Sequence, residues 1–379
     1  MAMAELAGVF EAVQELADGI RDRGAEIERA GRLPADIVAS LHAAGVFRLW
    51  MPVELGGFEA APADVVRLVQ ALSEADGSTG WCSATGLASN IAGALLSEPT
   101  ARELYSTGSE LCGGALMPGG RAVPQPDGGF LVSGRWSFGS GTQHCDWLVG
   151  TTLIVADGPP AARAVLMARS AVEFVENWQV VGLAGTGSVD YRVHELYVPA
   201  ERALDLANTV PWPAGSMWQI PLRSLLYPIL AAVPLGIARR ATTELAALTD
   251  RVRYGSQSRL ADREVVQAAV ARARALIDSG AGYLSATLQA LRDAADAGRV
   301  PSAIERADAR LAAAFATEQA VEAVSLCYRT AGTAAIYQDN ALQRALRDVN
   351  TASQHYALSG QGYQLAGRVL LGFDPDPML

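Results

Sequence analysis

Apolar residues recur at helical spacing through the first part of the chain. From Ala4 to about Leu111 they return every three or four positions, as in ADIVASLHAAGVFRLW and APADVVRLVQALSEAD, and proline or glycine marks the ends of these stretches. The pattern predicts an N-terminal helical domain over residues 1–110.

The pattern changes to alternation and tight turns between Leu111 and about Leu206. PDGGFLVSGRWSF is typical of a turn and a strand, DWLVGTTLIVADGPPAARAVLMA of a hairpin, and GSVDYRVHELYVP of a further strand. We therefore predict a small β domain over residues 111–206. The proline- and glycine-containing segment Asp205 to Ser216 is the predicted linker that follows it.

Helical periodicity returns over residues 217–379, in four long stretches. Together they predict a C-terminal four-helix bundle, with helices over Pro221 to Leu248, Asp262 to Ala297, Ser302 to Thr330 and Ala341 to Leu371. The expected fold class is mainly α with a β middle domain.

Composition narrows the function. The chain has 379 residues, half of them hydrophobic, which is enough for a large core. Its net charge of −10 disfavours binding to a phosphate backbone, so nucleic acid is not an expected partner. All basic residues other than histidine are arginine, which excludes a Schiff-base or P-loop lysine mechanism.

The cysteines and the apolar stretches give no sign of a disulfide framework or a membrane span. Cys82, Cys112, Cys145 and Cys327 form no C-x-x-C pair and are expected to be buried free thiols. The longest apolar stretch, from Ser224 to Ala238, contains two prolines and is shorter than the roughly 18 to 20 residues of a span. We expect a cytoplasmic protein without a membrane partner.

Common catalytic and cofactor motifs are missing from the sequence. No G-x-G-x-x-G follows a strand, and the histidines show no H-E-x-x-H spacing, so neither a Rossmann site nor a metal site is predicted. There is no G-x-S-x-G elbow of a serine hydrolase. The GSG at Gly139 to Gly141 lacks the G-K-[ST] ending of a phosphate loop, and taken alone it is better explained as a turn that ends a strand.

Three segments carry a family resemblance. GRWSFGSGTQHCDWLVG (residues 134–150), WQVVGLAGTGSVDYRVHELYVP (178–199) and ALQRALRDVNTASQH (341–355) together resemble the acyl-CoA dehydrogenase superfamily. The resemblance spans nearly the whole chain. It implies an N-terminal helical domain, a small β-barrel-like domain and a four-helix bundle that hold one flavin, FMN or FAD, usually in a homotetramer.

The resemblance also implies the flavin contacts. Ser140 is the expected hydroxyl near the flavin N5, and RVRYG places a phosphate-binding arginine at Arg251. Weaker matches are equally well explained by helix surface or helix packing, and these are Gln267, Gly332 and Thr333. The remaining implied contacts, from the strand and loops around the ring, are Trp136, Phe138, Gly141, Gly113, Gly114 and Ala115.

The glutamate that abstracts a proton in the dehydrogenases is missing. In the family it commonly stands eight residues beyond the aspartate that matches Asp348, and here that position is Tyr356. Other members carry it on the first bundle helix, but no acidic residue stands between Asp205 and Glu244. The resemblance therefore disfavours α,β-dehydrogenation of an acyl thioester.

A histidine, His355, directly precedes the position of the missing acid. In the group D two-component flavin monooxygenases of this superfamily, a histidine of the matching helix points at the flavin. These enzymes take reduced flavin from a separate reductase and form a C4a-hydroperoxide with O2. An imidazole with an unperturbed pKa of about 6.5 could donate a hydrogen bond or accept a substrate proton there. A packing histidine is the alternative interpretation.

The resemblance to group D enzymes also implies a substrate pocket, to which Trp81, Asn90 and Tyr356 would contribute. Plain core packing explains the apolar residues of this helix, from Gly80 to Leu96, about equally well. The leading hypothesis is a flavin-dependent monooxygenase of secondary metabolism that hydroxylates a small, aromatic or polyketide-like molecule. Its catalytic residues would be His355 and Ser140. The alternatives are a flavin oxidase or desaturase, an amino-sugar N-oxygenase, or a scaffold that has lost flavin and serves in binding or assembly.

Overall fold

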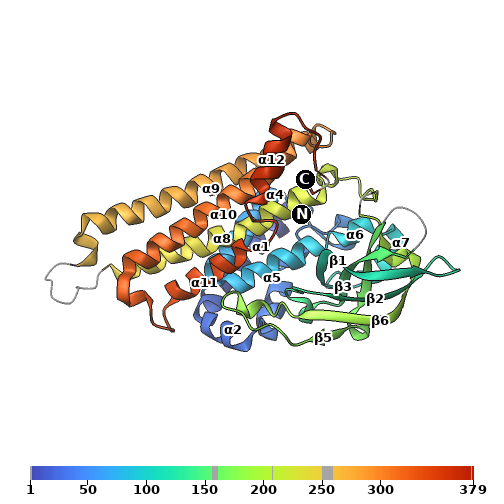
Figure 1. Cartoon of the computed structure of the whole chain (residues 1–379), viewed down its shortest axis with the longest axis horizontal. Coiled ribbons are helices and arrows are strands. Elements are labelled where there is room, and N and C mark those ends of the chain that lie inside the picture. The colour runs from blue at the N-terminus through green and yellow to red at the C-terminus, as the bar shows by residue number, and fades with distance from the viewer. Residues whose placement is uncertain (1, 156–160, 207, 250–258, 377) are drawn as a thin grey trace.

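The structure is a computed structural model that describes residues 2–155, 161–206, 208–249, 259–376 and 378–379. Helices, a sheet and a helical bundle follow one another along the chain, and Figure 1 shows the sheet beside one end of the bundle. The predicted fold class, mainly α with a β middle part, is confirmed.

Helix α5 is the element of the N-terminal part that positions the site. The carboxylate of Asp76 caps it, because Oδ1 accepts from the amide of Thr79 at 2.7 Å and satisfies a free donor of the first turn. The helices of this part are α1 (Ala2–Asp22), α2 (Gly24–Ala30), α3 (Ala35–Ala43), α4 (Pro62–Ala75), α5 (Gly77–Ser89), α6 (Ala92–Leu95) and α7 (Glu98–Leu104).

Seven strands form one sheet in the order β5-β6-β2-β1-β3-β4-β7. All neighbours are antiparallel except β1 and β3, whose parallel register shifts between Ala115 and Gly120. The strands are β1 (Cys112–Pro124), β2 (Phe130–Trp136), β3 (Trp147–Ile154), β4 (Ala162–Ala168), β5 (Glu173–Val175), β6 (Asp190–Val198) and β7 (Ala203–Leu204).

The bundle is built around α8, whose neighbours are α4, α5 and the other long helices. Among the described residues, α8 is long and apolar enough to cross a membrane, but 83% of its apolar window is buried in the fold, as in a core helix. The bundle helices are α8 (Leu222–Leu248), α9 (Glu264–Asp296), α10 (Ala303–Ala331), α11 (Ala341–Ser353) and α12 (Gln361–Leu370).

The predicted single helix from Ala341 to Leu371 is wrong. It is divided into α11 and α12 by the irregular segment 354–360, so His355 lies in a turn and not within a helix. The amide of His355 still donates to Ala352 O, and that of Leu358 donates to His355 O, which closes the chain into tight turns. This break gives the imidazole a direction that a continuous helix would not.

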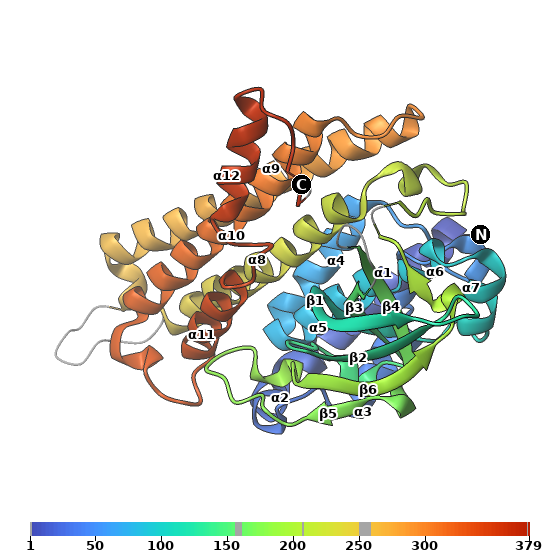
Figure 2. The same ribbon diagram turned by 45° about the vertical axis from the view of Figure 1, so that its right-hand side comes forward.

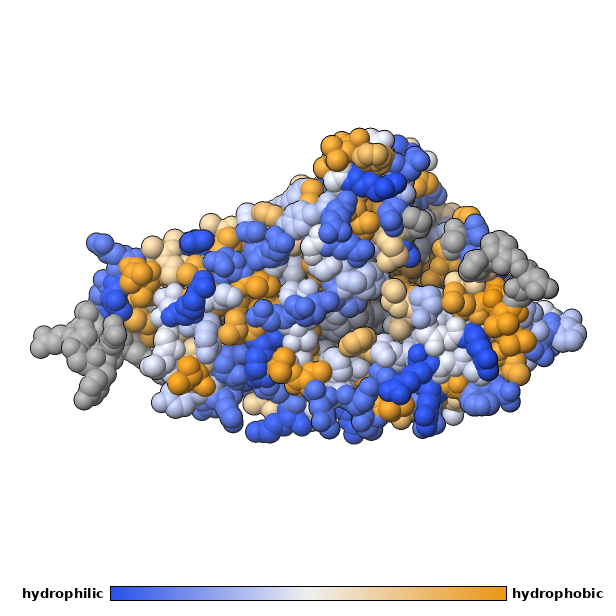
Figure 3. Space-filling model, viewed as in Figure 1, coloured by the Kyte–Doolittle hydropathy of each residue, from blue (hydrophilic) through white to orange (hydrophobic). Residues whose placement is uncertain are grey.

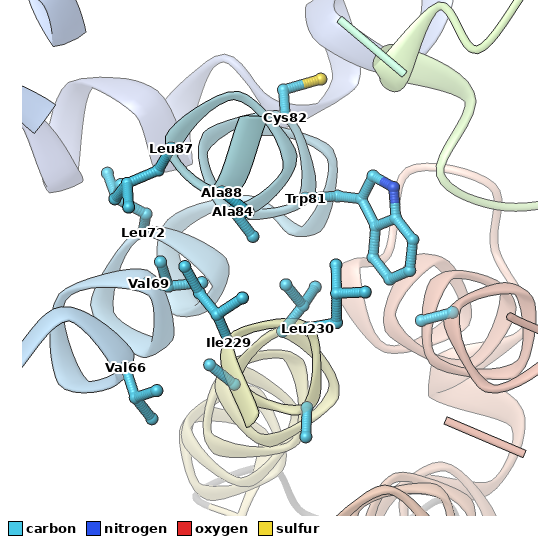
Figure 4. Close-up of a cluster of buried hydrophobic side chains, with 14 of the residues drawn as sticks. Val66, Val69, Leu72, Trp81, Cys82, Ala84, Leu87, Ala88, Ile229 and Leu230 are labelled. Carbon is cyan, nitrogen blue, oxygen red and sulfur yellow. The ribbon is translucent and has the colours of Figure 1, made fainter. Parts of the chain in front are cut away.

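Helix α5 lies between the bundle and the sheet (Figures 1 and 2). In Figure 4, Leu72 of α4, Leu87 of α5 and Leu230 of α8 belong to one apolar cluster, and the indole of Trp81 points away from Leu72 and Leu87. The core therefore fixes α5 firmly while one large aromatic side chain leaves it toward the site.

Candidate active site

Three predicted residues from distant parts of the chain meet beside α5. The indole Nε1 of Trp81 donates to Ser140 Oγ at 3.1 Å, and the same indole lies edge-on to the imidazole of His355, with ring centroids 5.4 Å apart. In Figure 3 the surface is hollowed over the middle of α5, between the bundle and the sheet. A tryptophan, a hydroxyl and an imidazole thus meet beside α5, the helix over which the hollow lies.

Behind Ser140 runs a chain of hydroxyl groups that sequence reasoning missed. Ser140 Oγ lies 2.6 Å from Ser188 Oγ, which lies 2.7 Å from Thr186 Oγ1. Thr186 Oγ1 donates to Leu183 O at 2.8 Å. The signal was present in the GTGS segment at residues 185–188, which places two hydroxyl side chains two residues apart.

Phe138 forms an aromatic wall beside Ser140. Its side chain is 71% exposed, its φ is +63°, and its ring lies edge-on to Trp178 with centroids 6.3 Å apart. A bulky residue in the left-handed region is rare and is held there by its surroundings. Because nothing in the described chain covers this phenyl ring, the pair can take a flat aromatic ligand.

The imidazole of His355 is neutral and its tautomer is defined. Nδ1 accepts a hydrogen bond from the amide of Ala357 at 3.2 Å, so the ring proton of the neutral form sits on Nε2. Burial, and after it the charge of Arg310, lowers the pKa of His355 to about 4. The expectation that His355 accepts a substrate proton near neutral pH is therefore corrected, because its second nitrogen is an N–H donor.

Arg310 of α10 holds the turn that carries His355. Its guanidinium is 1% exposed and donates to Ala357 O at 2.6 Å and to Tyr356 O at 2.8 Å. The guanidinium carbon lies 4.6 Å from the ring centre of Tyr227. Among the described residues it forms no ion pair with a carboxylate. Tyr356, a predicted pocket residue, is half-buried with its ring 4.7 Å from that of His355.

Asp348 of α11 holds the opposite loop. Its Oδ1 accepts from the amide of Leu183 at 2.6 Å, and Leu183 itself has a φ of +52°. Burial is the main cause that raises the pKa of Asp348 to about 7; the hydrogen bond from the Leu183 amide acts against it and the nearby carboxylate of Asp76 acts with it. Burial also raises the pKa of Asp76. Asp76 and Asp348 line a pocket together with Arg344, and Trp81, Ser140 and His355 are not among its lining residues.

The R-x-x-R-D segment of α11 makes ion pairs with α2. Arg347 contacts Glu28 at 2.5 Å and donates to Val181 O at 2.6 Å, and Arg344 contacts the same carboxylate at 3.4 Å. These contacts fix α11 against α2 and against the segment before Leu183.

Two predicted site residues are buried away from the hollow, and their assignment is corrected. Trp136 is 1% exposed, donates from Nε1 to Thr151 O at 2.8 Å and stacks on Tyr191 inside the sheet. Asn90 is fully buried, and its amide joins Phe47 O at 3.0 Å and the amide of Cys112 at 2.8 Å. Both side chains have their polar groups satisfied within the chain, so they support the site without lining it.

The predicted backbone contacts also have partners within the chain. Gly113, Gly114 and Ala115 lie in strand β1 and not in a loop, and the amide of Ala115 donates to the hydroxyl of Tyr191 at 2.9 Å. The amide of Gly141 donates to Thr186 O at 3.0 Å, and glycine stands there because φ is +67°. These amides are not free for a ligand at Ala115 and Gly141.

The weaker matches lie at another end of the molecule. Gln267 is exposed in the first turn of α9, and Gly332 and Thr333 are exposed just after α10, in the 3-10 turn η9 (Gly332–Ala335). In Figure 1 both places are at the left-hand end of the bundle, whereas the sheet lies at the right. Arg251 lies outside the described residues.

Comparison with known proteins defines the class. Residues 5–102 match the family model for the acyl-CoA dehydrogenase N-terminal domain, and residues 228–360 match that for the acyl-CoA dehydrogenase C-terminal domain. Indole-3-acetate monooxygenase of Pseudomonas putida is 30% identical over 97% of this chain and 95% of its own length. The oxygenase component of FADH2-dependent resorcinol hydroxylase from a Rhizobium strain is 28% identical over 96% and 94%.

Solved structures agree with this result. 3-HSA hydroxylase from Rhodococcus sp. RHA1 superimposes with a TM-score of 0.93 at 26% identity, covering 98% of this chain and 99% of that one. XiaF from Streptomyces sp., in complex with FADH2 and glycerol, gives 0.92 at 25% identity over 99% and 98%. The chain belongs to the acyl-CoA dehydrogenase superfamily. Within it, the chain is a flavin-dependent monooxygenase, an oxidoreductase that uses reduced flavin.

Proposed function

We propose that this protein uses reduced flavin and O2, through a C4a-hydroperoxide, to hydroxylate a small aromatic or polyketide-like molecule. The observation that carries the proposal is the meeting of Trp81, Ser140 and a neutral His355 at one hollow. The one charged side chain that acts on His355 among the described residues is the cation of Arg310. The site therefore offers a hydrogen-bond donor where a dehydrogenase needs a carboxylate base.

The residues around the hollow fit a flavin. Phe138 and Trp178 present an uncovered aromatic surface, and Ser140 Oγ is half-buried beside it. When bound, the flavin supplies the activation of oxygen. Phe138, Trp178 and Ser140 would hold the ring, and His355, whose Nδ1 is occupied by the amide of Ala357, would have its Nε2–H available as a hydrogen-bond donor. The names of the relatives, which include indole-3-acetate monooxygenase and resorcinol hydroxylase, support an aromatic substrate.

The test is rapid mixing of anaerobic protein and reduced FMN or FAD with oxygenated buffer, followed by absorbance. We expect a long-lived species that absorbs between reduced and oxidised flavin, and whose decay a true substrate accelerates. Immediate return to oxidised flavin with release of hydrogen peroxide, with every aromatic compound tried, would favour the oxidase or desaturase alternative. Failure to bind either flavin would favour the scaffold alternative.

His355 gives a second test. His355→Ala removes the Nε2–H donor, so we expect unchanged affinity for flavin, hydroxylation slower by about 100-fold and release of hydrogen peroxide instead. His355→Gln places an amide N–H near the position of Nε2 and should recover part of the coupling. Undiminished coupled turnover in His355→Ala would remove His355 from the site.

The proposal includes two kinds of partner. A separate flavin reductase supplies the reduced cofactor, as the name of the Rhizobium relative, an oxygenase component, suggests. A homotetramer would bring the exposed Gln267, Gly332 and Thr333 of one copy to the flavin of another. The 13-residue helix α11, about 20 Å long, separates the segment after η9 from the turn of His355, so Gly332 and Thr333 lie far from the hollow of their own chain. Sedimentation with and without flavin tests the assembly.

A further inference from the structure

We propose that Thr186 and Ser188 are positioning residues that fix Ser140 as a hydrogen-bond acceptor, so that the site prefers reduced over oxidised flavin. The inference rests on the proposed function, with the flavin N5 beside Ser140 as the family resemblance implies. It assigns roles to two hydroxyl groups that touch neither substrate nor flavin. Their effect reaches the cofactor only through the direction of one O–H bond.

The direction follows from counting protons. A hydroxyl group has one proton to donate and two lone pairs that accept. Thr186 Oγ1 gives its proton to the carbonyl of Leu183 at 2.8 Å, so the 2.7 Å contact with Ser188 requires Ser188 to donate. Ser188 then has no proton left, and the 2.6 Å contact with Ser140 requires Ser140 to donate inward.

Trp81 closes the arrangement from the other side. An indole N–H is only a donor, and Nε1 of Trp81 lies 3.1 Å from Ser140 Oγ. Ser140 therefore donates its hydroxyl proton to Ser188 and accepts a hydrogen bond from Trp81. One lone pair of its oxygen remains for a ligand. Toward the hollow it can accept a hydrogen bond but cannot donate one.

Burial makes this direction permanent. Thr186 is 2% exposed and Ser188 is 3% exposed, so water does not compete for their hydroxyls. The amide of Gly141 donates to Thr186 O at 3.0 Å, which ties the chain to the loop that carries Ser140. Hydrogen bonds that run in one direction also polarise one another, which strengthens the last acceptor.

The two redox states of a flavin differ at N5. Reduced flavin carries an N–H there and donates, whereas oxidised flavin has a bare nitrogen and accepts. An acceptor fixed at Ser140 is complementary to the reduced state and leaves the oxidised state facing an oxygen lone pair. An enzyme that receives reduced flavin from a reductase must release the oxidised flavin after each turnover. Weaker binding of oxidised flavin favours its exchange for the next molecule of reduced flavin.

The experiment measures binding and not turnover. Dissociation constants of reduced and oxidised FMN and FAD are determined by anaerobic and aerobic titration for the wild type, Ser188→Ala and Thr186→Val. Each variant frees the Ser140 proton, which can then turn toward the hollow and donate to oxidised flavin. We expect the ratio of the two dissociation constants to fall by about tenfold, the change made by one hydrogen bond.

Matched variants separate direction from packing. Thr186→Ser keeps the hydroxyl and should keep the wild-type ratio. Ser83→Ala removes a buried hydroxyl of α5 that has no partner among the described residues, and it should also leave the ratio unchanged. If Ser188→Ala fails to fold, Thr186→Val against Thr186→Ser provides the same comparison.

The outcomes distinguish the two proposals. An unchanged ratio in Ser188→Ala and Thr186→Val, with flavin still bound, would overturn the role of the hydroxyl chain and leave the monooxygenase proposal standing. A wild-type protein that binds neither redox state would overturn both.

Discussion

Arg310 and Asp348 perform the same task on opposite sides of the site with opposite charges. Arg310 binds the carbonyls of Tyr356 and Ala357 and so holds the turn of His355, whereas Asp348 binds the amide of Leu183 at the far end of the hydroxyl chain. Both side chains are nearly inaccessible to water. The anchors differ in what burial does to their charge.

A guanidinium stays protonated at any physiological pH, but a carboxylate can take up a proton. Arg310 therefore remains a cation that lies over Tyr227 and disfavours a charge on His355. The pKa of Asp348 is raised to about 7, so this anchor titrates in the physiological range. One side of the site is expected to be insensitive to pH and the other sensitive, and the following predictions test that difference.

The largest effect is expected from Arg310→Met. The variant leaves two buried carbonyls without donors, and we expect the free energy of unfolding to fall by about 2–4 kcal/mol in urea titrations followed by circular dichroism. Arg292→Met is the matched control, because Arg292 forms an exposed pair with Asp296 along α9 and should cost below about 0.5 kcal/mol. Equal losses of unfolding free energy in Arg310→Met and Arg292→Met would show that Arg310 does not anchor the turn of His355.

The next effect concerns the titration of His355. Its folded pKa, about 4, lies below the unfolded value of about 6.5, so its neutral form contributes stability that is present above pH 6.5 and lost as pH falls toward 4. NMR titration should show a neutral imidazole at pH 6. In Arg310→Met the pKa should rise but stay below the unfolded value, because burial is the larger cause. A titration near pH 6.5 in the wild type would contradict the assignment.

A smaller effect is expected from Asp348→Asn. Because the folded pKa is raised, the protonated carboxyl contributes stability that is present below about pH 4 and lost as pH rises through 7. In Asp348→Asn the amide stays neutral at every pH and its oxygen still accepts from Leu183. Between pH 5 and 8 the free energy of unfolding of the variant should therefore fall by about 2 kcal/mol less than that of the wild type. If the free energy of unfolding of the wild type and of Asp348→Asn changed with pH in the same way, Asp348 would already be ionised at pH 5.

The smallest effect is expected from Arg347→Gln. Arg347 and Glu28 are both about one-third exposed, so their ion pair is partly screened by water. We expect a loss of about 0.5–1 kcal/mol that shrinks at high salt. A loss as large as that of Arg310→Met would mean that the ion pairs of α11, and not the two buried anchors, hold the site.

The sequence correctly predicted residues that meet at the hollow, but it assigned to the site other residues that are buried away from it. Ser140, His355 and Trp81 were all placed by the family resemblance. Trp136 and Asn90 were misplaced because side-chain direction depends on local geometry that the sequence does not display. Trp136 stands at the end of β2 and points into the sheet, and the left-handed backbone at Phe138 turns the next aromatic ring outward.

The two buried anchors were not predictable as such. Arg310 stands in a helix rich in alanine, and its partners are backbone carbonyls 46 and 47 residues away, which leave no mark on composition. The break after α11 was missed for a related reason, since no proline marks it and the apolar pattern continues across residues 354–360. Such features arise from tertiary contacts that local patterns do not encode.

The hydroxyl chain behind Ser140 ends at a peptide carbonyl. A carbonyl oxygen accepts a hydrogen bond but has no proton of its own to pass on, so among the described residues the chain is closed at its inner end and Ser140 is the end that faces the hollow. Once ligands cover the hollow, the hydroxyl protons of Ser140, Ser188 and Thr186 are expected to exchange slowly with solvent. An enzyme moved from H2O into D2O with its ligands in place should complete its first turnover with the light isotope still on Ser140.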